Sequence, residues 1–134
     1  MVKPILRATV LEKCFAFTLI ELLVVMAILG LLLSLSVPQY FNHVDKARES
    51  VLRQDLAQLR DAIDKHFGDT ALYPDTLDDL VKKKYIRRIP VDPITDRADS
   101  WVVVAPEKKE LGKVFDVKSG ATTLARDGRT YASW

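Results

Sequence analysis

One long apolar segment near the N-terminus restricts what this chain can fold into more than any other feature. Residues 17–37 read FTLIELLVVMAILGLLLSLSV and hold a single charged side chain, Glu21. As a helix, this segment would span about 32 Å, which matches the hydrocarbon core of a bilayer. It lacks the polar stripe of an amphipathic surface helix, and the 97 residues that follow are too few to wrap it on every side as a buried core helix. We therefore predict that it crosses a membrane.

The flank before this segment predicts the orientation of the chain. Residues 1–16 carry Lys3, Arg7 and Lys13 against Glu12. Their net charge of +2 equals that of the whole chain, so the remaining residues hold acids and bases in equal number. Positive charge on a flank keeps that flank in the cytoplasm. We expect the C-terminal part in the periplasm or outside the cell.

Three kinds of processing compete. A secretory signal peptide could be cut after Ser36, where Ser34 and Ser36 are suitably small, although the apolar run is longer than such signals usually have. A lipoprotein signal ending at Cys14 fails, because Glu12 and Lys13 precede the cysteine and the apolar run follows it. The third is a leader cut on the cytoplasmic side, which leaves the apolar segment in the mature protein.

Glu21 favours the third kind of processing. A carboxylate inside a membrane span costs about 3 kcal/mol and usually marks a function, unless it reaches the headgroups or is protonated. The residues from Phe17 to Val25, FTLIELLVV, resemble the start of mature type IV pilins and type II secretion pseudopilins. Counted from Phe17, Glu21 falls at the fifth-position glutamate of these proteins. Gly30 and Pro38 also fall where the family commonly has a glycine and a proline.

The resemblance implies a processing site and an assembly contact. A prepilin peptidase would cut between Ala16 and Phe17 and then methylate the new Phe17 amine. In a filament, Glu21 would neutralise the N-terminal amine of an adjacent subunit. The family usually has glycine before the cut, so Ala16 is a departure; alanine is similarly small, and we expect cleavage at a slower rate.

The two helix-weakening residues predict where the long helix can bend or melt during packing. Pro38 removes a backbone hydrogen bond, and Gly30 is a weak helix former. The resemblance implies loss of helix between them in assembled filaments. An alternative role for Gly30 is close helix–helix packing in the membrane.

Beyond Pro38 the apolar period changes. Apolar side chains recur at steps of three and four from Tyr40 to Phe67, which predicts an amphipathic helix over 39–67 with Gly68 as its C-cap. One helix over 17–67 would therefore be membrane-bound in its first half. Lys46, Arg48 and Glu49 are interpreted as solvated surface, with pairing between subunits as the alternative.

Residues 68–134 are expected to form a globular head that packs on the amphipathic half of the helix, because they are too few for an independent core. Residues 75–81 predict a short capped helix. The β-rich runs 101–105 and 114–119 predict a hairpin, and residues 130–134 a last short strand. The expected fold is α+β and type IV pilin-like: a long N-terminal helix on a three-stranded antiparallel sheet.

Further residues resemble the G-type major pseudopilin of type II secretion systems. They are Tyr73-Pro74 with Leu77 and Leu80, followed by Ile89-Pro90, Asp92-Pro93 and the tail 116–134. Many such proteins bind calcium before the C-terminus. A calcium site needs six to eight oxygens, and the tail offers only the weak candidates Asp116, Ser119 and Asp127. We therefore expect no cofactor. Asp92, Asp96 and Asp99 are interpreted as a solvated loop.

Other functional classes have little support. The small net charge does not favour nucleic acid as a partner, and one cysteine excludes a disulfide framework or a multi-cysteine zinc site. The two histidines, His43 and His66, are too far apart on one helix to share a site. The basic run 82–88 suits the end of the short helix, with an acidic partner as the alternative. Hydrolase, metalloprotease and phosphate-loop motifs are missing, so we expect no enzyme.

The sequence therefore predicts a structural pseudopilin, held in the bacterial inner membrane by one span with its head in the periplasm. It would polymerise into a fibre that drives protein export across the outer membrane. Its implied partners are copies of itself, minor pseudopilins, the prepilin peptidase, an inner-membrane platform with its ATPase, and membrane lipid. The alternatives are a type IV pilus pilin and a secreted soluble protein cut after Ser36.

Overall fold

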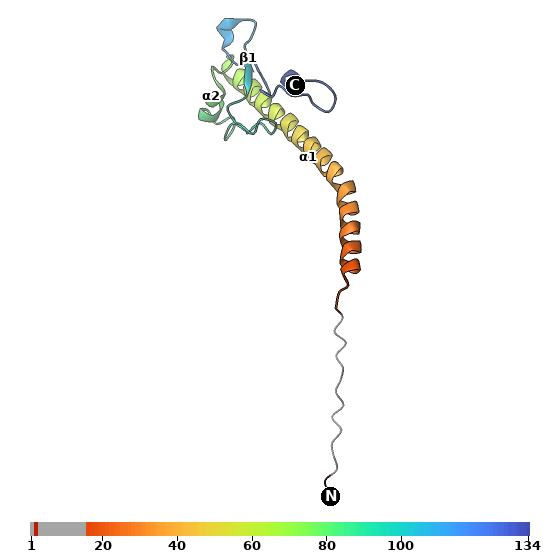
Figure 1. The fold of residues 1–134 in the computed structure, drawn as a ribbon. Helices are drawn as coiled ribbons and strands as arrows, with labels where there is room; N and C mark the ends of the chain where they lie inside the picture. Colours follow the sequence, from red (N-terminus) through yellow and green to blue (C-terminus); the bar gives the residue numbers. More distant parts are fainter. Residues whose placement is uncertain (1, 3–15) are drawn as a thin grey trace. The chain divides into compact units, whose positions relative to one another are not determined.

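The structure is a computed structural model that describes residue 2 and residues 16–134 (Figure 1). The predictions for Lys3 to Cys14 lie outside the described residues. The chain divides into two compact units, residues 1–40 and residues 41–134. The boundary between them falls inside one long helix, α1, which runs from Leu19 to Thr70.

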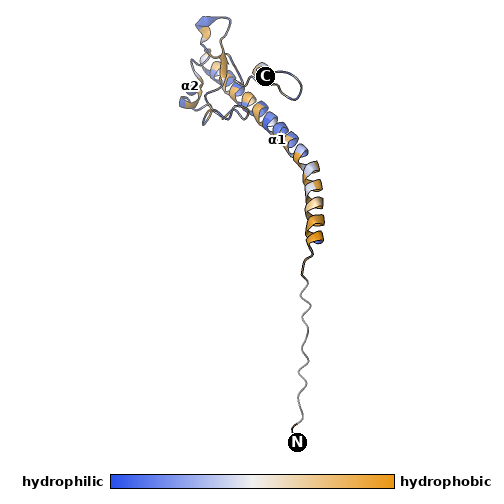
Figure 2. Cartoon of the chain, viewed as in Figure 1, coloured by the Kyte–Doolittle hydropathy of each residue, from blue (hydrophilic) through white to orange (hydrophobic). Residues whose placement is uncertain are grey.

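In the first unit, α1 begins two residues later than predicted, because Thr18 caps it. The Thr18 hydroxyl accepts a hydrogen bond from the Glu21 backbone N–H at 3.2 Å, which satisfies a donor that the first turn leaves unpaired. Large apolar side chains follow on every side and are exposed; Figure 2 shows this stretch as mostly hydrophobic. The helix is long and apolar enough to cross a membrane, and none of its apolar window is buried.

The helix continues through both residues that were expected to weaken it, Gly30 and Pro38. A side chain at Gly30 would meet no atom within 4 Å, so the face around this glycine is open in the single chain. Melting between the two residues on filament packing stays a prediction.

In the second unit, the head packs on the amphipathic half of α1, as predicted. The helix contributes Leu52, Leu56, Leu59, Ala62 and Ile63, which recur on one face. Figure 2 shows polar and apolar residues mixed along this part of α1. From the head, the core receives Leu77, Leu80, Ile86, Trp101, Val114, Val117, Ala121, Ala125 and Tyr131.

The C-terminus of α1 differs from the prediction. The helix passes through Gly68 and ends at Thr70, and Ala71 adopts the left-handed conformation with a φ of 57°. The Thr70 hydroxyl donates to the His66 carbonyl at 2.7 Å and accepts from the Leu72 N–H at 3.3 Å. Because this hydroxyl satisfies the end of the helix, no glycine is needed there.

The turn after α1 explains the motif at Tyr73-Pro74. The Tyr73 ring stacks on Phe67 at a centroid distance of 4.4 Å, and Pro74 is fully buried. Helix α2, Leu77–Lys82, then begins with a capping box, in which Thr76 accepts from the Asp79 N–H and the Asp79 carboxylate accepts from the Thr76 N–H. Leu77 and Leu80 point into the core. The short helix is confirmed.

The predicted hairpin is confirmed, with shorter strands. Strand β1, Val102–Val104, pairs antiparallel with β2, Asp116–Lys118, and Val103 lies opposite Val117. The connection contains a 3-10 turn, η1, at Lys109–Leu111. This sheet has two strands.

The expected third strand is wrong. The turn at Asp127-Gly128 forms, but it leads to a single bridge between Leu124 and Thr130, followed by a 3-10 turn, η2, at Tyr131–Ser133. The N–H groups of Ser133 and Trp134 donate to the carbonyls of Thr130 and Tyr131 at 3.0 Å, so they are not available to pair with a neighbouring strand. The long helix and small antiparallel sheet nevertheless confirm an α+β, type IV pilin-like fold.

Candidate functional site

The predicted cleavage and assembly residues lie at the exposed start of α1. Ala16 and Phe17 are non-helical and exposed, with Phe17 78% accessible. Exposed backbone outside regular structure is where proteases act most readily. The Glu21 carboxylate is exposed in the first turn, and it has no hydrogen-bond or ion-pair partner among residues 16–134. Residues 16–134 therefore present an accessible peptide bond and, four residues after it, a carboxylate that has no partner among them.

The alternative cleavage position lies in a different environment. Ser36 is inside α1, and its hydroxyl donates to the Leu32 carbonyl at 2.9 Å. The helix continues on both sides of this residue, so a peptidase would have to unwind it before cutting there.

The three calcium candidates do not converge, because each has a partner of its own. Asp116 accepts from Arg60 Nε at 2.7 Å, and Asp127 accepts from Arg129 Nη2 at 2.7 Å. The Ser119 hydroxyl donates to a carboxylate in another loop. Within the part of the chain that the structure describes, no group of three His, Cys, Asp or Glu side chains could hold a metal.

Asp92, the partner of Ser119, is a residue whose role the sequence analysis missed. It was expected in a solvated loop, but it is fully buried. Its Oδ2 accepts from the Ser119 hydroxyl at 2.6 Å, and its Oδ1 from the Ile94 N–H at 2.8 Å. The Asp-Pro pair was the available signal, since aspartate before proline commonly starts a turn in which its side chain binds the backbone. Asp96 and Asp99 are exposed, as expected.

Glu49 is the second buried acid that was expected on the surface. Only 6% of it is exposed, and its Oε1 accepts from both the Arg126 N–H and the Tyr131 hydroxyl at 3.0 Å. Burial raises the pKa of Tyr131, and the hydrogen bond to Glu49 raises it further. Lys46 and Arg48 are exposed, as predicted. Glu49 therefore binds the C-terminal segment to α1.

Comparison with known proteins identifies the family. The family model described as "Prokaryotic N-terminal methylation motif" matches residues 13–37, which contain Phe17 and Glu21. The type II secretion system core protein G of Vibrio cholerae is 35% identical over 89% of this chain and 85% of its own length. This chain belongs to the type II secretion core protein G family. It is a pseudopilin, a structural subunit of the type II secretion pseudopilus.

Two other core G proteins show how far the similarity extends. That of Escherichia coli is 36% identical over 75% of this chain and 77% of its own length. That of Pseudomonas aeruginosa is 38% identical over 58% of this chain, which spans 66% of the length of that relative. No solved structure matches the chain significantly.

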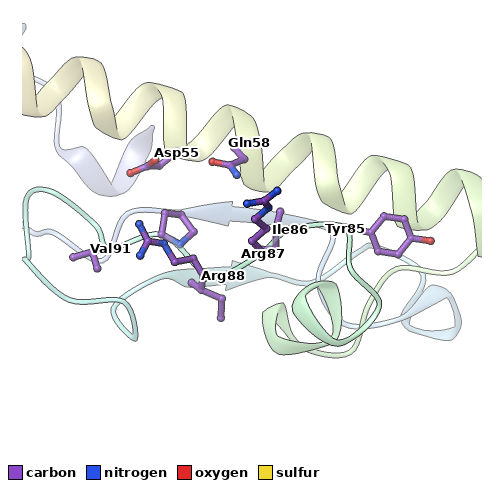
Figure 3. A pocket seen from close by; sticks show the side chains of 9 residues that line it. Asp55, Gln58, Tyr85, Ile86, Arg87, Arg88 and Val91 are labelled. Atoms are coloured by element: carbon purple, nitrogen blue, oxygen red, sulfur yellow. The ribbon is translucent and has the colours of Figure 1, made fainter.

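The basic run of this pseudopilin separates into two parts. The first part, Lys82 and Lys83, lies at the C-terminal end of α2 and makes contacts within the head. Lys82 lies 4.0 Å from Asp79, and Lys83 Nζ lies 2.9 Å from His66 Nε2. Arg87 and Arg88 have no hydrogen-bond or ion-pair partner among residues 16–134. They line a cavity of about 700 Å³ between α1 and the segment 85–91, and Figure 3 shows Asp55 and Gln58 on its helical side.

Burial raises the pKa of Asp55, which lines this cavity, and the negative charge of Asp92 raises it further.

The two histidines form no catalytic pair. His66 is buried, and its ring is held between the Leu72 carbonyl, 2.8 Å from Nδ1, and Lys83 Nζ, 2.9 Å from Nε2. Each ring nitrogen of His66 therefore has a partner within the head. His43 is exposed and lies 23 positions earlier on α1. His66 therefore has a structural role in closing the turn after α1.

Proposed function

We propose that this pseudopilin is anchored in the bacterial inner membrane by the first part of α1, with residues 41–134 in the periplasm. There it polymerises into a fibre that drives proteins through the outer membrane. The observation that carries this proposal is the Glu21 carboxylate, which has no partner among residues 16–134 and lies in an exposed apolar helix. The residues around it match the family model of the N-terminal methylation motif. Residues 16–134 supply no partner for this carboxylate, and an isolated charge in a membrane span is costly, so we propose that another subunit supplies the partner.

The proposed role is mechanical and not catalytic. The buried polar side chains of the head, Glu49, His66, Asp92 and Ser119, all have partners within the fold. Force for extraction and polymerisation would come from an inner-membrane platform with its ATPase, and minor pseudopilins would share the fibre. The prepilin peptidase and membrane lipid are the remaining partners, and no nucleic acid is involved.

Deleting the gene tests this function. We expect exported proteins to accumulate in the periplasm of the deletion strain and to reappear in the medium when the wild-type gene is restored. Surface pili and DNA uptake should stay unchanged, which separates a secretion pseudopilus from a type IV pilus. A strain that loses pili while it continues to secrete would contradict the proposal.

The mature N-terminus tests the processing step. We expect intact-mass analysis of the membrane-extracted protein to give a chain that begins at N-methylated Phe17. A matched Ala16→Gly variant, which restores the residue usual in the family, should be processed faster in a pulse–chase experiment. A mature chain that begins at Val37 would instead show a secreted protein cut after Ser36.

A further inference from the structure

Two charged side chains of α1 form hydrogen bonds with the C-terminal segment of the head, residues 116–134. The first is Arg60, whose Nε donates to Asp116 Oδ1 at 2.7 Å and whose Nη2 donates to the Val117 carbonyl at 3.0 Å. The second is Glu49, which accepts from the Arg126 N–H and the Tyr131 hydroxyl. They are separated by three helical turns, so they lie on the same face of α1.

Arg60 binds a carboxylate oxygen and a backbone carbonyl oxygen, which are both common ligands of calcium in proteins. Both oxygens lie at the start of the segment. Its guanidinium is a fixed positive charge whose donors match a carboxylate and a carbonyl in one plane. A calcium ion bound at Asp116 Oδ1 would have to displace the guanidinium, and one near the rest of this carboxylate would be repelled by the guanidinium charge.

The other two candidate ligands are held in the same way. Asp127 accepts from both Nε and Nη2 of Arg129, at 2.9 and 2.7 Å, and these bonds keep the pKa of Asp127 below its usual range. Ser119 is buried, and its hydroxyl donates to Asp92. The donor set of the described residues therefore does not fit calcium, because Asp116, Ser119 and Asp127 each already have a protein partner and the three do not converge.

We infer that Glu49 and Arg60 close the head of this pseudopilin in place of a calcium ion, so that its folding and stability are independent of calcium. Together the two side chains hold the C-terminal segment on α1, as a bound cation would, but one is positively charged and the other negatively charged. Arg60 supplies the positive charge to the strand that begins the segment. Glu49 fixes the loop and the 3-10 turn that end it.

Thermal unfolding of the full chain in detergent tests the inference. Both tryptophans, Trp101 and Trp134, lie in residues 41–134, so their fluorescence reports the head. We expect the same Tm, within about 1 °C, in millimolar calcium and in excess chelator, because a ligand that does not bind the folded state does not stabilise it. Titration calorimetry with calcium chloride should give no saturable heat. A calcium-dependent rise in Tm of several degrees would overturn the inference.

Variants of the two side chains test the positive half of the inference. We expect Glu49→Gln and Arg60→Met each to lower Tm by about 5–10 °C, and Arg60→Lys, which keeps the charge, by less. The matched controls are Lys65→Met, which breaks an exposed ion pair with Asp61 on the same helix, and Glu107→Gln at an exposed site. The controls should shift Tm by less than about 2 °C. Wild-type Tm values for both Glu49→Gln and Arg60→Met would overturn the inference.

Discussion

A Glu21→Ala pseudopilin should be inserted and cleaved like the wild type, yet assemble into no fibre. Removing the carboxylate makes the span more apolar, so insertion becomes easier by about 3 kcal/mol. The predicted cleavage site at Ala16 and Phe17 lies outside the helix, so the substitution does not change it. In the proposed fibre, however, assembly would bring a charged Phe17 amine of another subunit into an apolar environment. Without Glu21, that charge stays unpaired, which costs several kcal/mol.

The proposed contact between Glu21 and the neighbouring amine would also fix the axial register of the two helices. An ion pair between Glu21 and a neighbouring amine forms at one axial offset of two helices, whereas apolar side chains pack comparably well at several. We therefore expect Glu21→Gln, which keeps the size and loses the charge, to fail in assembly as Glu21→Ala does. The matched control is Ser34→Ala. It also removes a polar group from the span, but the Ser34 hydroxyl already donates to the Leu31 carbonyl of its own helix at 2.7 Å.

Pulse labelling measures cleavage of each variant, and chemical crosslinking of intact cells measures the ladder of oligomers. For Glu21→Ala and Glu21→Gln we expect wild-type cleavage, loss of the ladder above the monomer, and exported proteins retained in the periplasm. Ser34→Ala should match the wild type in all three. A full ladder from Glu21→Ala would show that Glu21 is not the assembly contact.

The features that the sequence predicted correctly depend on local patterns. The exposed apolar helix follows from the apolar run at 17–37, and α2 follows from a capping box whose two residues, Thr76 and Asp79, are three positions apart. The hairpin follows from two β-rich runs on either side of a charged turn. In each case the residues that decide the structure are close together in the chain, so their spacing alone carries the information.

The features that the sequence missed depend on contacts between distant residues. Glu49 is buried because Tyr131, 82 positions later, donates to it. Asp92 is buried because Ser119, 27 positions later, reaches it from another loop. A charged side chain is interpreted from the sequence as exposed to solvent, because charged residues are rarely buried unless a partner compensates them. The wrong third strand has the same origin, since packing of Tyr131 in the core turns residues 131–133 into a 3-10 turn.

Asp92→Ala should destabilise the head more than any other single loss of a carboxylate outside the membrane span. The substitution leaves the Ile94 N–H and the Ser119 hydroxyl buried or half-buried without their acceptor. Each unsatisfied donor costs about 1–3 kcal/mol, so we expect the free energy of unfolding to fall by about 3–5 kcal/mol. Asp92→Asn keeps one acceptor oxygen for the Ile94 N–H, so it should lose less than Asp92→Ala.

Urea unfolding followed by tryptophan fluorescence measures these differences, since a lower midpoint with an unchanged slope reports stability alone. Ser119→Ala removes the donor to Asp92 and should cost about 1–2 kcal/mol. In the double variant, the loss should be smaller than the sum of the two single losses, because the two residues share one interaction. Asp99→Ala is the control: Asp99 is exposed and pairs with the exposed Arg97, so its loss should stay below about 1 kcal/mol. Equal midpoints for Asp92→Ala and Asp99→Ala would mean that the buried carboxylate does not hold the loop to the head.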